Sequence, residues 1–193
     1  MKALGLADKV DFVTASLAKS FAGRAGLVVG PAGFLDYFWF TSRPAIFSSC
    51  LLPHEIAGLD KTLEVIAAAD DRREALRRNA DFIRSGLHDL GYNVEASQSQ
   101  IIALESGLEL TTLTLRAALE DEGVYGSVFC APATPKKRAL VRFSIHAGLQ
   151  VAELERLLTA CQRIRKRVGM AHWPSTLRRS ETVQEPSRSV ASV

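Results

Sequence analysis

Hydrophobic and polar positions predict strands near the beginning of the chain. Residues 10–17 (VDFVTASL) are rich in β-branched and aromatic side chains, which predicts a buried strand. Residues 27–30 (LVVG) predict a second short strand after a turn that contains glycine. Two short strands joined by such a turn indicate a hairpin-like excursion within a larger sheet.

A helical pattern follows. Apolar side chains recur at helical spacing from Ile56 to Leu87, and this predicts one long helix with the charged residues 70–73 on its solvent side. Gly86 and Gly91 are expected to end this helix.

From Tyr92 onward strands and helices alternate. The predicted strands are 101–105, 125–129 and 139–145, and the predicted helices are 111–123 and 151–168. This order predicts an α/β fold of modest size, with a domain boundary near 88–92. The polar stretch 170–193, with two prolines and many serines and arginines, is expected to be a disordered tail.

Composition excludes several classes of protein. With 193 residues, 47% of them hydrophobic, the chain is long enough and apolar enough to bury a core. No apolar run reaches the ~18–20 residues of a membrane helix, and the charged N-terminus is unlike a secretory signal. Three scattered cysteines suit neither a disulfide framework nor a zinc site and predict a reducing, cytoplasmic location. A net charge of +3 does not indicate a nucleic-acid partner.

Candidate chemistry is concentrated around Lys19, which directly follows the first predicted strand among small residues. A charged ammonium is costly to bury there, and a neutral amine is what a Schiff-base lysine needs. Ser16 adds a hydroxyl and Arg24 a cation, while Gly23 and Gly26 allow the backbone to approach a ligand closely. These groups suit an aldehyde cofactor with a phosphate, although the residues equally fit a strand-end lysine that points to solvent.

Four segments carry a resemblance to a known family. They are TASLAKSFAGRAG, PAIFSSCLLPHEIAGL, SQSQIIALESG and GVYGSVFCAPAT, in this order along the chain. They resemble the pyridoxal-phosphate-dependent α-oxoamine synthases, which have the fold-type I (class II aminotransferase-like) architecture. Within this family the segments are most similar to the α-hydroxyketone quorum-sensing autoinducer synthases. The resemblance extends over about residues 3–165.

The resemblance implies roles for individual residues. Lys19 would form the Schiff base with pyridoxal 5'-phosphate (PLP) and then remove the Cα proton of the substrate. Ser16 would donate to the cofactor phosphate, and Arg24 would be a further phosphate contact. Ser48 and Ser49 match positions that reach the phosphate from the partner subunit of a homodimer.

The resemblance also implies a substrate contact and a domain organisation. Arg142 matches an arginine that holds the substrate carboxylate, a task that suits a guanidinium because it can pair bidentately; a solvent-facing arginine on an edge strand is the alternative. Residues 1–88 would be the end of the cofactor-binding large domain plus the long interdomain helix, and residues 89–169 the small C-terminal α/β domain. Residues 170–193 would be the tail.

The family is longer than this chain, and its N-terminal half carries an aspartate for the pyridine nitrogen and a histidine that stacks on the ring. No Asp-x-x-His motif precedes Lys19. We therefore expect the chain to be the C-terminal half of such an enzyme, with little synthase activity by itself. An open strand edge is expected where the N-terminal half belongs.

The predicted function is an acyltransferase that condenses an acyl-CoA with an amino acid or related 2-amino donor. Its product would be an α-aminoketone or α-hydroxyketone precursor of a quorum-sensing autoinducer. A general α-oxoamine synthase, of the aminolevulinate, 8-amino-7-oxononanoate or sphingoid-base type, is one alternative. A non-catalytic α/β remnant that dimerises or binds a partner is another. No metal and no membrane partner are expected.

Overall fold

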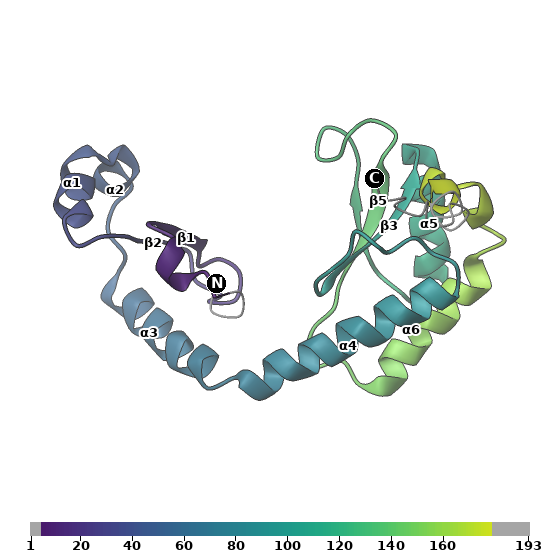
Figure 1. The fold of residues 1–193 in the computed structure, drawn as a ribbon, viewed down its shortest axis with the longest axis horizontal. Helices are drawn as coiled ribbons and strands as arrows, with labels where there is room; N and C mark the ends of the chain where they lie inside the picture. Colours follow the sequence, from purple (N-terminus) through teal and green to yellow (C-terminus); the bar gives the residue numbers. More distant parts are fainter. Residues whose placement is uncertain (1–4, 179–193) are drawn as a thin grey trace, which may run out of the picture. The chain divides into compact units, whose positions relative to one another are not determined.

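The computed structural model describes residues 5–178 and divides into two compact units (Figure 1). The first unit is Met1–Ala69 and the second is Asp70–Val193. Among the described residues, no helix combines the length and the apolar character needed to cross a membrane.

The first unit begins with a short 3₁₀ helix, η2 (Ala7–Lys9), followed by a hairpin. Strand β1 (Val13–Ser16) pairs antiparallel with β2 (Gly26–Val29), and the register places Val13 opposite Val29 and Ser16 opposite Gly26. The two strands and the hairpin that the sequence predicts are therefore confirmed, each within a few residues of the expected bounds.

The expectation that the first strand is buried is wrong for the described chain. Every residue of β1 and β2 is exposed or half-buried, and only Leu17, just after β1, is buried. The reason is that the two strands form a sheet of their own, with no further strand pairing to either outer edge among the described residues. The apolar residues of 10–17 predict a buried strand, but a sheet of only two strands leaves them exposed or half-buried.

Three helices complete the first unit: α1 (Phe34–Thr41), α2 (Arg43–Phe47) and α3 (Pro53–Ala67). The Ser42 hydroxyl accepts a hydrogen bond from the Ala45 backbone N–H at 3.4 Å and so caps α2. At α3, the Glu55 carboxylate accepts a hydrogen bond from the Leu52 backbone N–H at 2.8 Å. Proline in the first turn of each of α2 and α3 suits a helix start, where no intrahelical N–H is required.

The predicted single long helix is in fact two helices, α3 and α4 (Asp70–Asp89), interrupted at Ala68 and Ala69. Asp70 and Asp71 are exposed, as the sequence predicts, and they also form the acidic first turn of α4, where the helix dipole favours negative charge. The break also places α4 in the second compact unit, which begins at Asp70. The family-derived domains 1–88 and 89–169 stay a prediction.

The second unit is built on the three-stranded antiparallel sheet β3–β5–β4, which comprises β3 (Ile101–Gly107), β4 (Ser127–Phe129) and β5 (Ala139–Ser144). The register places Ile102 opposite Phe143 and Leu104 opposite Val141, so these buried side chains share one face. Ala103 lies opposite Arg142 on the other face.

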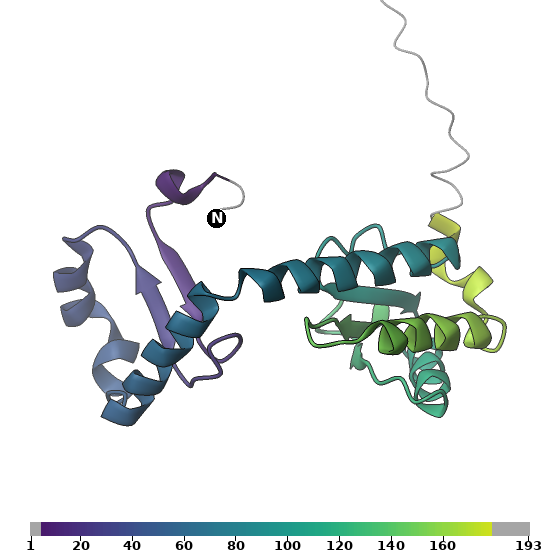
Figure 2. The same cartoon turned by 90° about the horizontal axis from the view of Figure 1, so that it is seen from below.

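Helices α4, α5 (Glu109–Asp121) and α6 (Val151–Ile164) contribute to one hydrophobic core with that buried face. In Figure 2, α4 and α6 lie side by side. Ile83, Leu115 and Ile164, one from each helix, are at most 2% exposed. The predicted α/β character and the order of elements after Tyr92 are thus confirmed.

The start of the expected disordered tail is ordered. The 3₁₀ helix η3 (Met170–His172) leads to Trp173, which is 3% exposed and lies in the same core. The Trp173 indole N–H donates to the Val168 carbonyl at 3.0 Å, and its ring lies 5.8 Å from that of Tyr92. The polar composition of 170–193 concealed the buried side chains of Met170 and Trp173. Residues 179–193 lie outside the described part of the chain.

Candidate functional site

The loop that carries Lys19, residues 17–25, joins β1 to β2 and is held by its own backbone. Leu17 donates its N–H to the Ala25 carbonyl and accepts at its carbonyl from the Gly23 N–H, both at 2.9 Å. Within the loop, the Ala22 N–H donates to the Lys19 carbonyl at 3.0 Å. The conformation of the lysine loop is therefore fixed at its base and at its turn.

The lysine loop also lies against α3. A Cβ atom added at Gly23 would be only 2.5 Å from Leu59 Cδ2, so a side chain there would push the loop away from the helix. Gly23 is therefore required for close packing. Lys19 itself is exposed, which corrects the expectation that its ammonium carries a burial cost.

Four of the predicted cofactor residues line one pocket of about 1140 Å³ in the first unit: Ser16, Arg24, Ser48 and Ser49. Residues of β1, β2, α1 and α2 complete its walls, together with the segment between α2 and α3. Lys19 is in the loop that begins at the β1 end of this pocket but does not line it. The structure thus brings together hydroxyl and guanidinium groups that are up to 33 positions apart in sequence.

Ser48 and Ser49 follow α2, and the backbone of Ser49 is left-handed, with a φ angle of 65°. Both serines are exposed and lie in the pocket of their own chain together with Ser16. Contact from these serines to a phosphate of a partner subunit stays a prediction.

Sequence reasoning missed Glu55, which also lines the pocket. Its carboxylate caps α3 through Leu52, so part of its hydrogen-bonding capacity is used structurally. The signal that could have revealed it is the Pro-His-Glu sequence at the start of a helix, where a glutamate in the first turn commonly reaches back to the backbone. The donors Ser16, Arg24, Ser48 and Ser49 suit an anionic group, with Glu55 as the one acidic side chain of the lining. Metal binding has no such support, because the described residues contain no cluster of three or more His, Cys, Asp or Glu that could hold an ion.

Arg142 lies on β5 of the second unit, outside this pocket. Its guanidinium carbon is 4.4 Å from the centroid of the Phe129 ring on β4, a cation–π contact that sequence reasoning also missed. The Nε atom of Arg142 is buried and has no hydrogen-bond partner in the described structure. Arg142 is therefore half-buried and held by an aromatic ring, in contrast to the freely solvated arginine that was the alternative.

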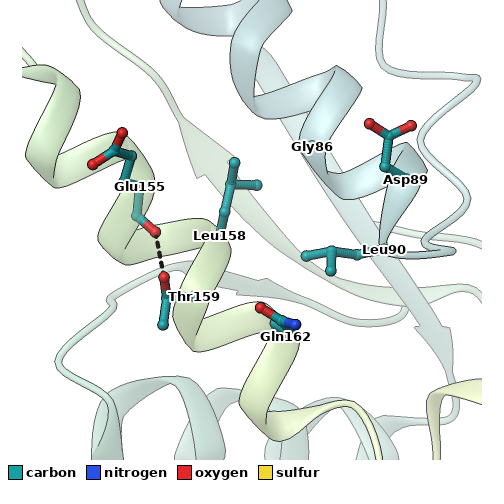
Figure 3. A pocket seen from close by; sticks show the side chains of 7 residues that line it. All are labelled: Gly86, Asp89, Leu90, Glu155, Leu158, Thr159 and Gln162. Atoms are coloured by element: carbon teal, nitrogen blue, oxygen red, sulfur yellow. Dashed lines mark hydrogen bonds between the residues drawn. The ribbon is translucent and has the colours of Figure 1, made fainter.

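A second cavity of about 470 Å³ lies between α4 and α6 in the second unit (Figure 3). Its lining residues are Gly86, Asp89, Leu90, Glu155, Leu158, Thr159 and Gln162. The Thr159 hydroxyl donates to the Glu155 carbonyl at 2.9 Å, as the dashed line in Figure 3 shows. None of the predicted site residues lines this cavity, and its Thr159 hydroxyl is already used within α6.

Comparison with known proteins places these observations in a family. Residues 2–161 match the profile of aminotransferase class I and II. The CAI-1 autoinducer synthase of Vibrio campbellii is 49% identical over 162 residues, which are 84% of this chain and 41% of that protein. The serine palmitoyltransferase of Sphingobacterium spiritivorum is 31% identical over 74% of this chain and 36% of that protein. The chain thus spans about two fifths of the length of these curated relatives.

A solved structure of SPT (serine palmitoyltransferase) with PLP as an internal aldimine has the same fold, with a TM-score of 0.80 and 29% sequence identity. The match covers 86% of this chain and 42% of the SPT chain. The expected resemblance and the expected α/β architecture are both confirmed by these matches.

Proposed function

Because this chain belongs to the aminotransferase class I and II family, we propose that it supplies the lysine-bearing part of a PLP-dependent acyltransferase. The reaction would join the acyl group of an acyl-CoA thioester to the α-carbon of an amino donor and release coenzyme A, and where the donor keeps its carboxylate that group would leave as CO2. Its product is an α-aminoketone or α-hydroxyketone that serves as an autoinducer precursor. The 49% identity to the CAI-1 autoinducer synthase of Vibrio campbellii supports the signalling branch.

The observation that carries the proposal is the placement of the lysine loop beside the pocket lined by Ser16, Arg24, Ser48 and Ser49. Hydroxyl donors and one guanidinium are the groups that bind phosphate in proteins. Their convergence from the hairpin and from the segment after α2 fits the phosphate of PLP. The volume of about 1140 Å³ leaves room for a substrate beside the cofactor.

Lys19 has two roles in this proposal. Its ε-amine would hold the cofactor through the aldehyde carbon, with loss of water, and once replaced there by the substrate amine it would accept the proton that leaves the substrate Cα. When bound, PLP supplies an electron sink for the charge that develops at that carbon. The backbone hydrogen bonds of the lysine loop, which join Leu17 to Ala25 and Gly23, fix the main chain that carries this amine.

Arg142 is proposed to hold the carboxylate of the amino donor. A guanidinium suits this task because its nitrogens can pair bidentately with a carboxylate. The contact with Phe129 keeps the guanidinium plane against an apolar ring, which limits its orientations.

A general α-oxoamine synthase is the second candidate, favoured by the 31% identity to the serine palmitoyltransferase of Sphingobacterium spiritivorum. The two candidates share the cofactor chemistry and differ in acyl and amino substrates. A homodimer that shares its active sites remains part of the proposal for both.

The test is to mix the purified 193-residue chain with PLP, reduce with borohydride and locate the modified peptide by mass spectrometry. We expect a Schiff-base absorbance band and reduced pyridoxyl label on Lys19. The Lys19→Ala variant should lose both, whereas Lys9→Ala, which removes another exposed lysine of the first unit, should retain them.

Label distributed over many lysines, or a band that persists in Lys19→Ala, would contradict the proposal and favour a non-catalytic α/β domain. We expect turnover of the isolated chain with acyl-CoA and amino donors to be low even when PLP binds, since it spans only about two fifths of its relatives. Full synthase turnover would refute that expectation.

A further inference from the structure

The end of α6 carries positive charge that the proposed function does not use. Residues 163–167 have the sequence RIRKR, so cationic side chains occupy all but one of these positions. Two of the cations are paired with acidic side chains at the end of α5. Arg163 pairs with Glu122 at 3.1 Å, and Arg167 pairs with Asp121. The positive charge that remains available is therefore that of the two residues between them.

Those two residues, Arg165 and Lys166, form no ion pair within the described part of the chain. Lys166 is exposed, whereas Arg165 is half-buried. The Nη2 atom of Arg165 is 3.8 Å from the position that a Cβ atom of Gly91 would occupy, so this guanidinium lies beside the turn that follows α4. A guanidinium held in this way, without a carboxylate against it, favours the approach of an anion.

Cations near the C-terminus of a helix can be explained by the helix dipole, but here the backbone itself satisfies the helix end. Gly169, which is left-handed with a φ angle of 61°, donates its N–H to the Lys166 carbonyl at 3.2 Å. Met170 donates its N–H to the Arg165 carbonyl at 3.1 Å. This pair of bonds is the pattern of a Schellman motif, which satisfies the last carbonyl groups of a helix. The side chains of Arg165 and Lys166 are therefore not required as caps.

The same turn encloses a cavity of about 560 Å³ at the end of α6. Arg163, Arg165 and Lys166 line it, and the His172 ring adds a further nitrogen-bearing side chain. No aspartate or glutamate is part of the lining. Cavities of about 300–1,000 Å³ are typical of sites for small molecules, so this one has room for more than a single phosphate.

We propose that this cavity, which we call the α6 basic pocket, binds a small molecule that carries two linked phosphate groups. The guanidinium groups of Arg163 and Arg165 can each pair with a separate phosphate, and Lys166 adds a point charge. The ion pair with Glu122 uses one terminal nitrogen of Arg163 and leaves its other donors for the ligand. The diphosphate can belong to a nucleotide or to a cofactor that contains a nucleotide.

The α6 basic pocket is independent of the site proposed for PLP. All its lining residues follow residue 161, where the match to the profile of aminotransferase class I and II ends. The inference goes beyond the proposed function, because it requires neither PLP nor Lys19. A nucleic acid fits less well, since its backbone needs cations spread along a surface, whereas here Asp121 and Glu122 flank a compact cavity.

The experiment is a calorimetric titration of the full chain, without PLP, with inorganic pyrophosphate. We expect saturable binding of one pyrophosphate per chain, and weaker binding of inorganic monophosphate. ADP and coenzyme A, each of which contains the diphosphate, are then titrated separately. Both should bind, and the one that binds more tightly identifies the source of the diphosphate.

Two variants remove one charge each from the α6 basic pocket. Lys166→Gln and Arg165→Gln should each weaken pyrophosphate binding about tenfold or more, the loss expected for a charge-assisted hydrogen bond. Lys166 is exposed, so its replacement should leave folding intact even if that of Arg165 does not. Arg167→Gln is the matched control, because it removes the same charge from an adjacent residue that does not line the pocket, and binding should stay unchanged.

Failure of this proposal and failure of the proposed function give different results. Lys19→Ala and Arg24→Gln, both altered in the first unit, should bind pyrophosphate as the unaltered chain does, whatever the outcome with PLP. Absence of saturable pyrophosphate binding would overturn the proposal. So would equal weakening by Arg167→Gln and Lys166→Gln, which indicates diffuse charge attraction, or loss of binding in Arg24→Gln, which places the ligand in the first unit.

Discussion

Replacing Trp173 by alanine is expected to destabilise the second unit strongly. The side chain is 3% exposed and lies in the main core, with its ring 5.8 Å from the ring of Tyr92. Truncating a buried tryptophan costs about 3–5 kcal/mol, because apolar burial is lost and a cavity remains. Loss of the indole N–H also removes the donor to the Val168 carbonyl.

The assay should report on the second unit alone, and Cys161 provides this. Cys161 is fully buried in α6, and burial raises the pKa of its thiol to about 12, so it should react with a thiol reagent only after the second unit unfolds. We therefore propose pulsed thiol labelling across a urea gradient, with the Cys161 peptide read by mass spectrometry. With a slope of about 1–3 kcal/mol per molar urea, Trp173→Ala should lower the labelling midpoint by roughly 2 M.

Two further variants make the result interpretable. Trp173→Phe keeps an aromatic ring but loses the donor to Val168, and should cost about 1–3 kcal/mol, so it remains measurable if the alanine variant does not fold. Leu177→Ala removes a half-exposed side chain nearby and should shift stability by less than about 0.5 kcal/mol. If Trp173→Ala moved the midpoint no more than Leu177→Ala does, the reasoning that residues 170–178 belong to the core would be refuted.

Two more predictions concern charge and thiol reactivity. Burial by itself would raise the pKa of Glu105, but its hydrogen bonds and charge attraction to Arg138 and Arg178 outweigh burial and lower the pKa below the usual 4.5. The carboxylate therefore stabilises the fold above pH 4.5, and this contribution disappears as the pH falls through the lowered pKa. Glu105→Gln should lower the free energy of unfolding by about 1–3 kcal/mol at neutral pH. In urea unfolding at decreasing pH, the free energy of unfolding of this variant should fall less steeply than that of the unaltered chain. In the native chain Cys50 is exposed and should be labelled by a thiol reagent within the time that leaves Cys161 unmodified, and equal labelling would contradict the core described here.

The sequence predicted the second unit well because its pattern is local and self-consistent. The alternation in residues 139–145 places Val141 and Phe143 on one face, and the strand and its buried side were both confirmed. The ordered segment at 170–178 was missed because its two buried apolar side chains, Met170 and Trp173, are too few to give a periodic pattern in a polar stretch. The contact of Arg142 with Phe129 was missed for a related reason: it depends on the pairing of β4 with β5, which no single segment encodes.

Candidate site residues could be named from the resemblance, but their geometry could not. No local pattern places Ser16 and Ser48 around one cavity, because their proximity depends on how α1 and α2 return the chain to the hairpin. Glu55 was overlooked because its place in the pocket depends on how the start of α3 lies beside the hairpin, which its own segment does not encode. The assignment of catalytic and cofactor roles to these residues is still a prediction.

The incorrect prediction of burial for residues 10–17 has a physical explanation that connects the two units. A strand covered on both faces reads as a continuous apolar run, whereas a strand with one solvated face alternates. Residues 139–145 alternate and are buried on one face, as the pattern requires. Residues 27–30 (LVVG) form a continuous apolar run, and residues 10–17 combine apolar side chains with polar ones at Asp11, Thr14 and Ser16, yet β1 and β2 are exposed or half-buried on both faces. The difference lies in what packs against each strand. β3 and β5 share a hydrophobic core with three helices, whereas β1 and β2 pair only with each other among the described residues, so the same kind of apolar residue is buried in one sheet and exposed in the other.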